Sequence, residues 1–160
     1  MIRKTCTNLQ CLINQVFHIF ILCSIVILPL NLLSQTSICF SAESETEQYL
    51  NSGAFDSGSA DIEIGYERTN PQIVGLRFTG VTIPVNATVS NATIQFRADE
   101  TSSGASDLDI FGELTDNAAP FNEAILFNVS DRVSTTNKVK WNPFQWIAGS
   151  QSNVQKTADL

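Results

Sequence analysis

The feature that most constrains the fold is an alternation of apolar and polar residues between positions 73 and 98. Apolar side chains occupy every second position in two segments, at Val74, Leu76 and Phe78 and again at Ala92, Ile94, Phe96 and Ala98. A period of two is typical of a β-strand that is buried on one face. Two amphipathic strands need a second layer to cover their apolar faces. The chain is therefore predicted to be all-β and to form an antiparallel β-sandwich.

Further strands are predicted on both sides of this stretch. Residues 61–67 alternate in the same way, and residues 125–129 form either a short strand or an extended crossing. A third clear alternation, over 108–114, follows a polar loop at 99–106, so it is predicted to form a hairpin with the strand that ends at Ala98. In the simplest register Ala98 lies opposite Leu108, and Arg97 lies opposite Asp109 as a cross-strand ion pair.

The N-terminal 41 residues have the layout of a secretory signal peptide. Arg3 and Lys4 precede an apolar run at 16–33, and no acidic residue occurs before Glu43. A signal helix, removed by cleavage after Ser41, is the favoured reading, and a retained membrane anchor is the alternative because the run is nearly long enough to span a bilayer. The predicted domains are thus a leader at 1–41 and one module at 42–160.

All four cysteines and the single histidine lie in this leader. The predicted module therefore excludes a disulfide framework, a zinc site built from Cys or His, a cysteine nucleophile and a triad with an imidazole base. Carboxylates are plentiful, but no spacing selects an acid and base pair for glycoside hydrolysis. We accordingly expect a protein that is not an enzyme.

Charge is distributed unevenly along the chain. All sixteen acidic residues and seven of the nine basic residues follow residue 42, which gives that part a net charge of −9. Nucleic acids and anionic lipids are bound by basic surfaces, so neither is an expected partner, and no membrane contact is expected after removal of the leader. The acidic run at 43–47 is predicted to be a solvated tail, and Thr157 or Asp159 to cap a helix that starts near the last residue.

The segment from 75 to 114 resembles a family of bacterial extracellular β-sandwich modules that shades into the DNRLRE-type carbohydrate-binding modules. The matching residues are Leu76, Arg77, Phe78, Ile83, Pro84, Ala87, Thr88, Val89, Ala92, Ile94, Gln95 and Phe96, with further likeness at 60–64, 112–113, 116–118, 141–143 and at Trp146. The resemblance covers roughly residues 47–160 and rests mainly on core strands and turns.

This resemblance implies a jelly-roll-like sandwich in a secreted or cell-surface protein, commonly appended to a larger chain. It also implies further strands after the predicted C-terminal helix, which this chain lacks, so the sandwich is expected to be incomplete at its C-terminus. A missing strand leaves backbone groups unpaired and part of the core uncovered. The resemblance makes polysaccharide or a cell-surface glycan the expected ligand.

Five residues are candidates for binding that ligand. Tyr66, Trp146 and Phe111 offer aromatic rings that could stack on a sugar, although a Trp in a sandwich more often packs in the core. Arg77 and Arg97 lie on the outward faces of predicted strands, where a guanidinium could hold the carboxylate of a uronic acid. The alternative for both arginines is a structural salt bridge.

No cofactor is expected, and calcium is the one ion considered. Asp99, Glu100 and Asp107 lie close together around the predicted hairpin loop, and calcium takes oxygen ligands with few geometric demands. They lack the spacing of a calcium-binding loop, so solvated acids are the favoured reading. The alternatives to glycan binding are a structural or adhesive spacer in a larger secreted protein and a truncated remnant without activity of its own.

Overall fold

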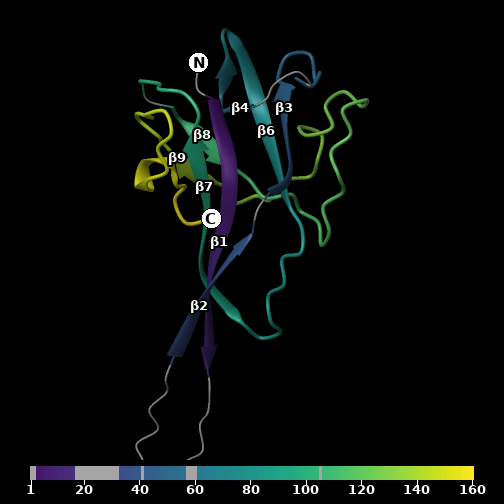
Figure 1. Ribbon diagram of the computed structural model, residues 1–160. Helices are drawn as coiled ribbons and strands as arrows, with labels where there is room; N and C mark the ends of the chain where they lie inside the picture. The colour runs from purple at the N-terminus through teal and green to yellow at the C-terminus, as the bar shows by residue number, and fades with distance from the viewer. Residues whose placement is uncertain (1–2, 17–32, 41, 57–60, 105) are drawn as a thin grey trace, which may run out of the picture.

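The structure is a computed structural model that describes residues 3–16, 33–40, 42–56, 61–104 and 106–160 (Figure 1). Within these ranges the regular structure consists of nine strands and one 3-10 turn, η1 at Asn153–Gln155. Every pair of strands is antiparallel. The prediction of an all-β fold is thereby confirmed. The described ranges contain no helix that is long and apolar enough to cross a membrane.

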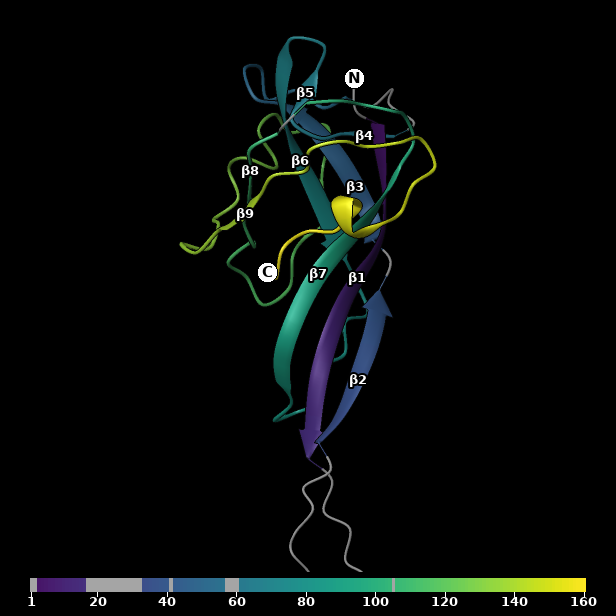
Figure 2. The same ribbon diagram turned by 90° about the vertical axis from the view of Figure 1, so that its left-hand side faces the viewer.

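The first sheet is built around β1, Arg3–Val16. β1 pairs with β7, Thr88–Ala98, along one edge, and with β4, Ile62–Glu63, and β2, Leu33–Phe40, along the other. The C-terminal half of β1 and the N-terminal half of β7, together with β2, extend beyond the rest of the molecule (Figure 2). β7, which carries one of the predicted alternations, therefore pairs along one edge with the N-terminal strand β1.

The second sheet contains β3, Ala42–Tyr49, β6, Asn70–Phe78, and β5, Tyr66–Glu67. The predicted strand at 61–67 is divided into β4 and β5, and Gly65 between them has a φ of +97°. The prediction of a solvated tail at 43–47 is wrong for its end, because β3 pairs with β6 and buries Thr46 and Glu47.

The third sheet is a two-stranded one, formed by β8, Leu108–Ile110, and β9, Val139–Trp141. The predicted hairpin between 92–98 and 108–114 is wrong. Leu108 pairs with Trp141, and Asp109 pairs with Lys140. Ion pairing follows the new register, because the Asp109 carboxylate accepts hydrogen bonds from Lys138 and Lys140 at 2.6 and 2.9 Å instead of pairing with Arg97. Residues 125–129, predicted as a strand or crossing, form turns.

One apolar core joins the three sheets. Its buried residues are Ile62, Ile94, Phe96, Ala98, Trp141 and Trp146, and Val74, Leu76, Phe78, Leu108 and Ile110 pack against them. The Phe96 ring stacks on Trp141 with their centroids 5.3 Å apart, and Trp146 lies 6.2 Å from Phe96. Six of the seven residues that the alternation placed on the inner faces of β6 and β7 thus belong to this core or pack against it, and Ala92 is the exception.

The leader is only partly covered by the described ranges. Residues 3–16 and 33–40 are strands, so a signal helix is not confirmed there. Most of the apolar run, at 17–32, and Ser41 of the expected cleavage site lie outside the described residues.

The C-terminal residues follow the free edge of β7. The Thr157 amide donates to the Ile94 carbonyl at 3.0 Å, and the Leu160 amide donates to the Ala92 carbonyl at 2.8 Å. The predicted helix start is wrong, because the side chains of Thr157 and Asp159 accept from the amides of Ile94 and Ala92 rather than capping a helix.

Candidate functional site

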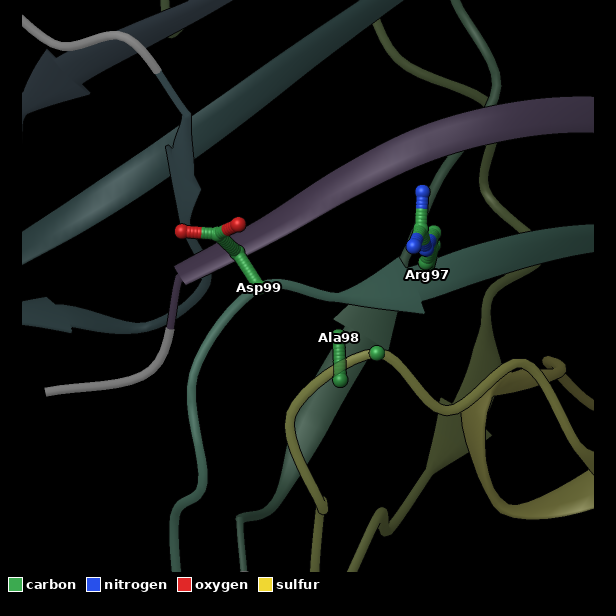
Figure 3. Close-up of a pocket in the computed structure, with 4 residues that line it drawn as sticks. Arg97, Ala98 and Asp99 are labelled. Atoms are coloured by element: carbon green, nitrogen blue, oxygen red, sulfur yellow. The ribbon is translucent and has the colours of Figure 1, made fainter.

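A shallow cleft of about 220 Å³ lies where β7 ends, lined by Arg97, Ala98, Asp99 and Gly149 (Figure 3). We call it the Arg97 cleft. Its floor is the pairing of β7 with a turn at 147–150. The Gly149 amide donates to the Ala98 carbonyl at 2.7 Å, and the Ala98 amide donates to the Ser150 carbonyl at 2.9 Å. The cleft is therefore held by backbone hydrogen bonds on both sides of Ala98.

Gly149 is required by the shape of this turn. The Ser150 amide donates to the Ile147 carbonyl at 2.9 Å, which closes a four-residue β-turn. Gly149, its third residue, has a φ of +77°, a backbone conformation that glycine adopts without strain. The Ala148 amide is tied to the Thr101 hydroxyl at 3.0 Å, which fixes the turn against the loop that follows β7.

Arg97 and Asp99 supply the chemistry of the cleft. They stand two residues apart at the end of β7, so their side chains extend to the same side of the strand (Figure 3), whereas Ala98 between them is buried in the core. Both residues are exposed. Among the ranges that the structure describes, no ion pair engages either of them. A guanidinium with five donors and a carboxylate with several acceptor sites are therefore presented side by side to solvent.

Such a pair suits a ligand that carries both donors and acceptors. Sugar hydroxyls do both, because each can accept from the guanidinium and donate to the carboxylate. The carboxylate of a uronic acid would be attracted by the Arg97 guanidinium but repelled by the negative charge of Asp99. The cleft is smaller than the roughly 300–1,000 Å³ of pockets that enclose drug-sized molecules, so it can receive one sugar unit at most.

The other predicted arginine and the predicted tryptophan have structural positions. Arg77 is half-buried on β6, and its Nε donates to the Ala118 carbonyl at 2.8 Å, which anchors the loop at 115–120. Trp146 is 1% exposed and packs against Phe96 and Trp141. Its ring has no exposed face on which a sugar could stack.

Tyr66 and Phe111 are exposed but lie outside the Arg97 cleft. Tyr66 is 62% exposed on β5, opposite Pro71, and Phe111 is 50% exposed directly after β8, with the Lys138 Nζ atom 5.9 Å from its ring centroid. Neither lines the cleft. The structure thus places the five predicted binding residues in separate surroundings, and of these five it is Arg97 that lines the Arg97 cleft.

The weak calcium candidates are not gathered into a site. Asp99 lines the Arg97 cleft, whereas Asp107 accepts hydrogen bonds from Lys140 at 3.1 Å and Asn142 at 3.3 Å. Within the described ranges no group of three or more His, Cys, Asp or Glu side chains is arranged to hold a metal ion. Glu100 is half-buried in the loop that follows β7.

A second polar region, which the sequence did not reveal, lies between β3 and β4. Glu47 and Glu63 are each 3% exposed, and one Glu47 carboxylate oxygen accepts a hydrogen bond from the Glu63 amide. The other Glu47 oxygen has no hydrogen-bond partner among the residues that the structure describes. Burial raises the pKa of Glu47 to about 7, against the lowering effect of that hydrogen bond and with further raising from the charges of Glu63, Asp56 and Asp61.

Tyr49 lies two residues further along β3 and holds the next pair of acids. Its hydroxyl donates to the Glu67 carboxylate at 2.5 Å and lies 3.2 Å from that of Asp56. The hydrogen bond to Glu67 raises the pKa of Tyr49 well above its usual range, because ionisation would lose it. Tyr49 also lines a second cleft of about 230 Å³ with Asn51, Ser52, Asn70 and Pro71. The Tyr49 hydroxyl is already hydrogen-bonded to carboxylates, and none of the residues that line this cleft is charged. We therefore regard the Arg97 cleft as the better candidate for binding.

Comparison of the chain with protein-family models, with curated proteins and with solved structures found no match. The residues of the Arg97 cleft that the sequence analysis missed are Ala98 and Gly149. The one available signal was the run of Gly, Ser and Asn at 149–153, a composition that is typical of a loop.

Proposed function

We propose that residues 42–160 form a non-catalytic, exported module that binds a neutral polysaccharide or cell-surface glycan in the Arg97 cleft. The observation that carries this proposal is the pair formed by Arg97 and Asp99, a donor group and an acceptor group that are both exposed and line one cleft. Hydroxyl pairs on a sugar ring match that arrangement.

Electrostatics supports a neutral ligand over an acidic one. The whole chain carries a net charge of −7, so a polyanion such as a uronic acid polymer is repelled at long range. Asp99 adds repulsion within the cleft itself. Both effects favour a neutral glycan as the ligand, whereas Arg97 alone would have suited a uronate as well as a sugar hydroxyl.

The proposed setting of the module is a jelly-roll-like β-sandwich in a secreted or cell-surface protein, made with an N-terminal signal peptide. The buried residues of the shared apolar core lie between 62 and 146, within the proposed module, which is consistent with this setting. The exposed position of the cleft at the end of β7 would leave it open to a polymer, which extends beyond the one unit that the cleft receives.

Affinity gel electrophoresis of the full chain tests the proposal. Gels contain either a neutral glucan or mannan, or polygalacturonate, and the Arg97→Ala variant is compared with Arg68→Ala. Arg68 is exposed on the turn between β5 and β6, so the control removes the same charge at a distance from the cleft. We expect a neutral polysaccharide to retard the wild type and Arg68→Ala but not Arg97→Ala. Absence of retardation on every gel would refute glycan binding and favour a structural or adhesive spacer.

A further inference from the structure

β7 is held between two segments that come from opposite ends of the chain. On one edge the C-terminal segment at 156–160 pairs with Ala92 and Ile94 through the hydrogen bonds already given, and Gly149 and Ser150 pair with Ala98. The backbone groups of successive residues in a strand face opposite edges. Because the even-numbered residues 92, 94 and 98 are satisfied on this edge, the odd-numbered residues of β7 direct their amides and carbonyls to the other edge.

β1 covers that other edge. It is antiparallel to β7 over ten Cα pairs, from Lys4 opposite Ala98 to Asn14 opposite Thr88. A buried strand edge without a partner would leave a row of donors and acceptors unsatisfied, each at a cost comparable to a lost hydrogen bond. The middle of β7 is buried at Thr93, Ile94 and Phe96, so this part of the edge depends most on a neighbouring strand.

The sequence of β1 matches the faces of β7 in register. Cys6 and Leu9 lie opposite the core residues Phe96 and Ile94, and Cys11 lies opposite the half-buried Ala92, which the alternation of β7 places on the same face. Thr5, Asn8 and Gln10 lie opposite Arg97, Gln95 and Thr93, which belong to the polar face. The register shift between Cys6 and Asn8 is what keeps the apolar row aligned after Thr7. A one-residue slip would otherwise exchange the two faces of β1.

β1 belongs to the segment that the sequence predicts to be a cleaved leader. It is joined to the remainder of the chain through β2, and both strands precede residue 41. Removal of residues 1–41 would take away the whole partner of the β7 edge, whereas every strand from β3 onward would remain. β7 would then present an open strand edge beside the core residues Ile94 and Phe96.

We propose that the edge of β7 at residues 88–98 is a strand-binding site, which β1 fills in the full chain and an extended segment of another polypeptide fills once residues 1–41 are removed. The partner segment is antiparallel to β7, about ten residues long and apolar at the positions opposite Ala92, Ile94 and Phe96. Backbone hydrogen bonds supply its affinity and the apolar row its specificity, as in other complexes formed by strand addition. The site is independent of the Arg97 cleft and of any glycan.

The test uses the full chain with a site for a specific protease placed between β2 and β3. The folded protein is cleaved, and a labelled peptide of residues 3–16, with Cys6→Ala and Cys11→Ala, is offered to cleaved and uncleaved protein and followed by fluorescence anisotropy. We expect the two fragments to co-elute after cleavage and the peptide to exchange with the N-terminal fragment. The uncleaved chain should bind at least about tenfold less peptide, because its edge is filled.

Two peptide variants test the register. Leu9→Asp changes a residue opposite Ile94 in the apolar row, and Gln10→Asp makes the same charge change opposite Thr93 in the polar row. Leu9→Asp should bind at least about tenfold more weakly than Gln10→Asp, whereas equal affinities would refute the register.

Two outcomes of cleavage would overturn the proposal. The first is separation of the fragments that leaves 42–160 a monomer with unchanged near-ultraviolet circular dichroism and no affinity for the peptide, because the edge then needs no partner. The second is dimerisation of 42–160 in preference to binding the peptide, which would make a second copy of this chain the occupant.

Discussion

Replacing Glu47 by glutamine should stabilise the protein above pH 7 and leave its stability unchanged near pH 4. Glu47 is buried on β3, where one carboxylate oxygen accepts from the Glu63 amide and the other has no hydrogen-bond partner within the described part of the chain. A glutamine keeps an acceptor for the Glu63 amide but carries no charge into the buried site. On the neighbouring β1 strand, Arg3 is the Cα partner of Glu63.

The sign of the effect follows from the raised pKa. Folding raises the pKa of Glu47 from 4.5 to about 7, so the folded protein binds this proton more tightly than the unfolded chain does. Ionised Glu47 therefore lowers the free energy of unfolding of the wild type. This loss of stability is absent below pH 4.5, grows as the pH rises from 4.5 to 7 and is complete above pH 7. Each pKa unit corresponds to about 1.4 kcal/mol, which gives a penalty of about 2–3 kcal/mol after allowance for relaxation around the carboxylate.

Urea denaturation between pH 4 and pH 8, followed by tryptophan fluorescence, measures the difference between Glu47→Gln and the wild type. Using the difference removes the contribution of surface pairs such as Asp109 with Lys140, which both proteins share. Glu123→Gln is the matched control, because Glu123 is exposed. A stability difference for Glu47→Gln that does not change between pH 4 and pH 8 would refute this reasoning.

Three further predictions concern packing. Arg132→Lys should lower the free energy of unfolding by about 2 kcal/mol. The Arg132 guanidinium donates to four carbonyl or carboxylate groups at 2.8–2.9 Å and lies 4.5 Å from the Phe121 ring centroid, so an unchanged urea midpoint would contradict this prediction. Gly75→Ala should cost about 1–3 kcal/mol, because its new Cβ would lie 2.7 Å from the Phe121 ring; a thermal melt equal to the wild type would show that the ring moves aside freely. Trp146→Ala should cost about 3–5 kcal/mol while Tyr66→Ala stays within about 0.5 kcal/mol; similar losses in calorimetry would disprove the assigned burial.

Residue alternation predicted which faces of the strands are buried, but not which strands are neighbours. The inward residues Val74, Leu76 and Phe78 belong to β6, and Ile94 and Phe96 to β7, as the period of two indicates. Period alone fixes a face because successive side chains alternate. Pairing depends on contacts between distant segments, and it was here that the predicted hairpin of β7 with 108–114 failed.

Two local patterns were misinterpreted, because the role of each side chain depends on which distant strand lies beside it. Thr157 and Asp159 have the chemistry of helix caps, and they do accept from backbone amides, but the amides belong to β7. Glu47 lies in an acidic run typical of a solvated tail, yet β3 pairs with β6 and carries it into the interior. Neither outcome could be decided without knowing which strand lies alongside.

The candidate site was predictable in part. Arg97 was singled out because it is a charged residue on the outward face of a predicted strand, and it does line a cleft. Asp99 was considered only as a calcium ligand. Gly149 had no functional signal, because it contributes a turn that pairs with Ala98 of β7, 51 residues earlier in the sequence. Trp146 was ambiguous from sequence, and its position depends on contacts with Phe96 and Trp141.

Binding of a neutral glycan at Arg97 can be observed residue by residue with nuclear magnetic resonance. A neutral oligosaccharide is titrated into the labelled full chain while the Arg97 Nε–H signal and the Gly149 amide signal are followed. If the glycan binds in the Arg97 cleft, these two signals should shift first and saturate together, with smaller changes at Asp99. Saturable shifts confined to Tyr66 or Phe111, or no shift with any neutral oligosaccharide, would contradict it.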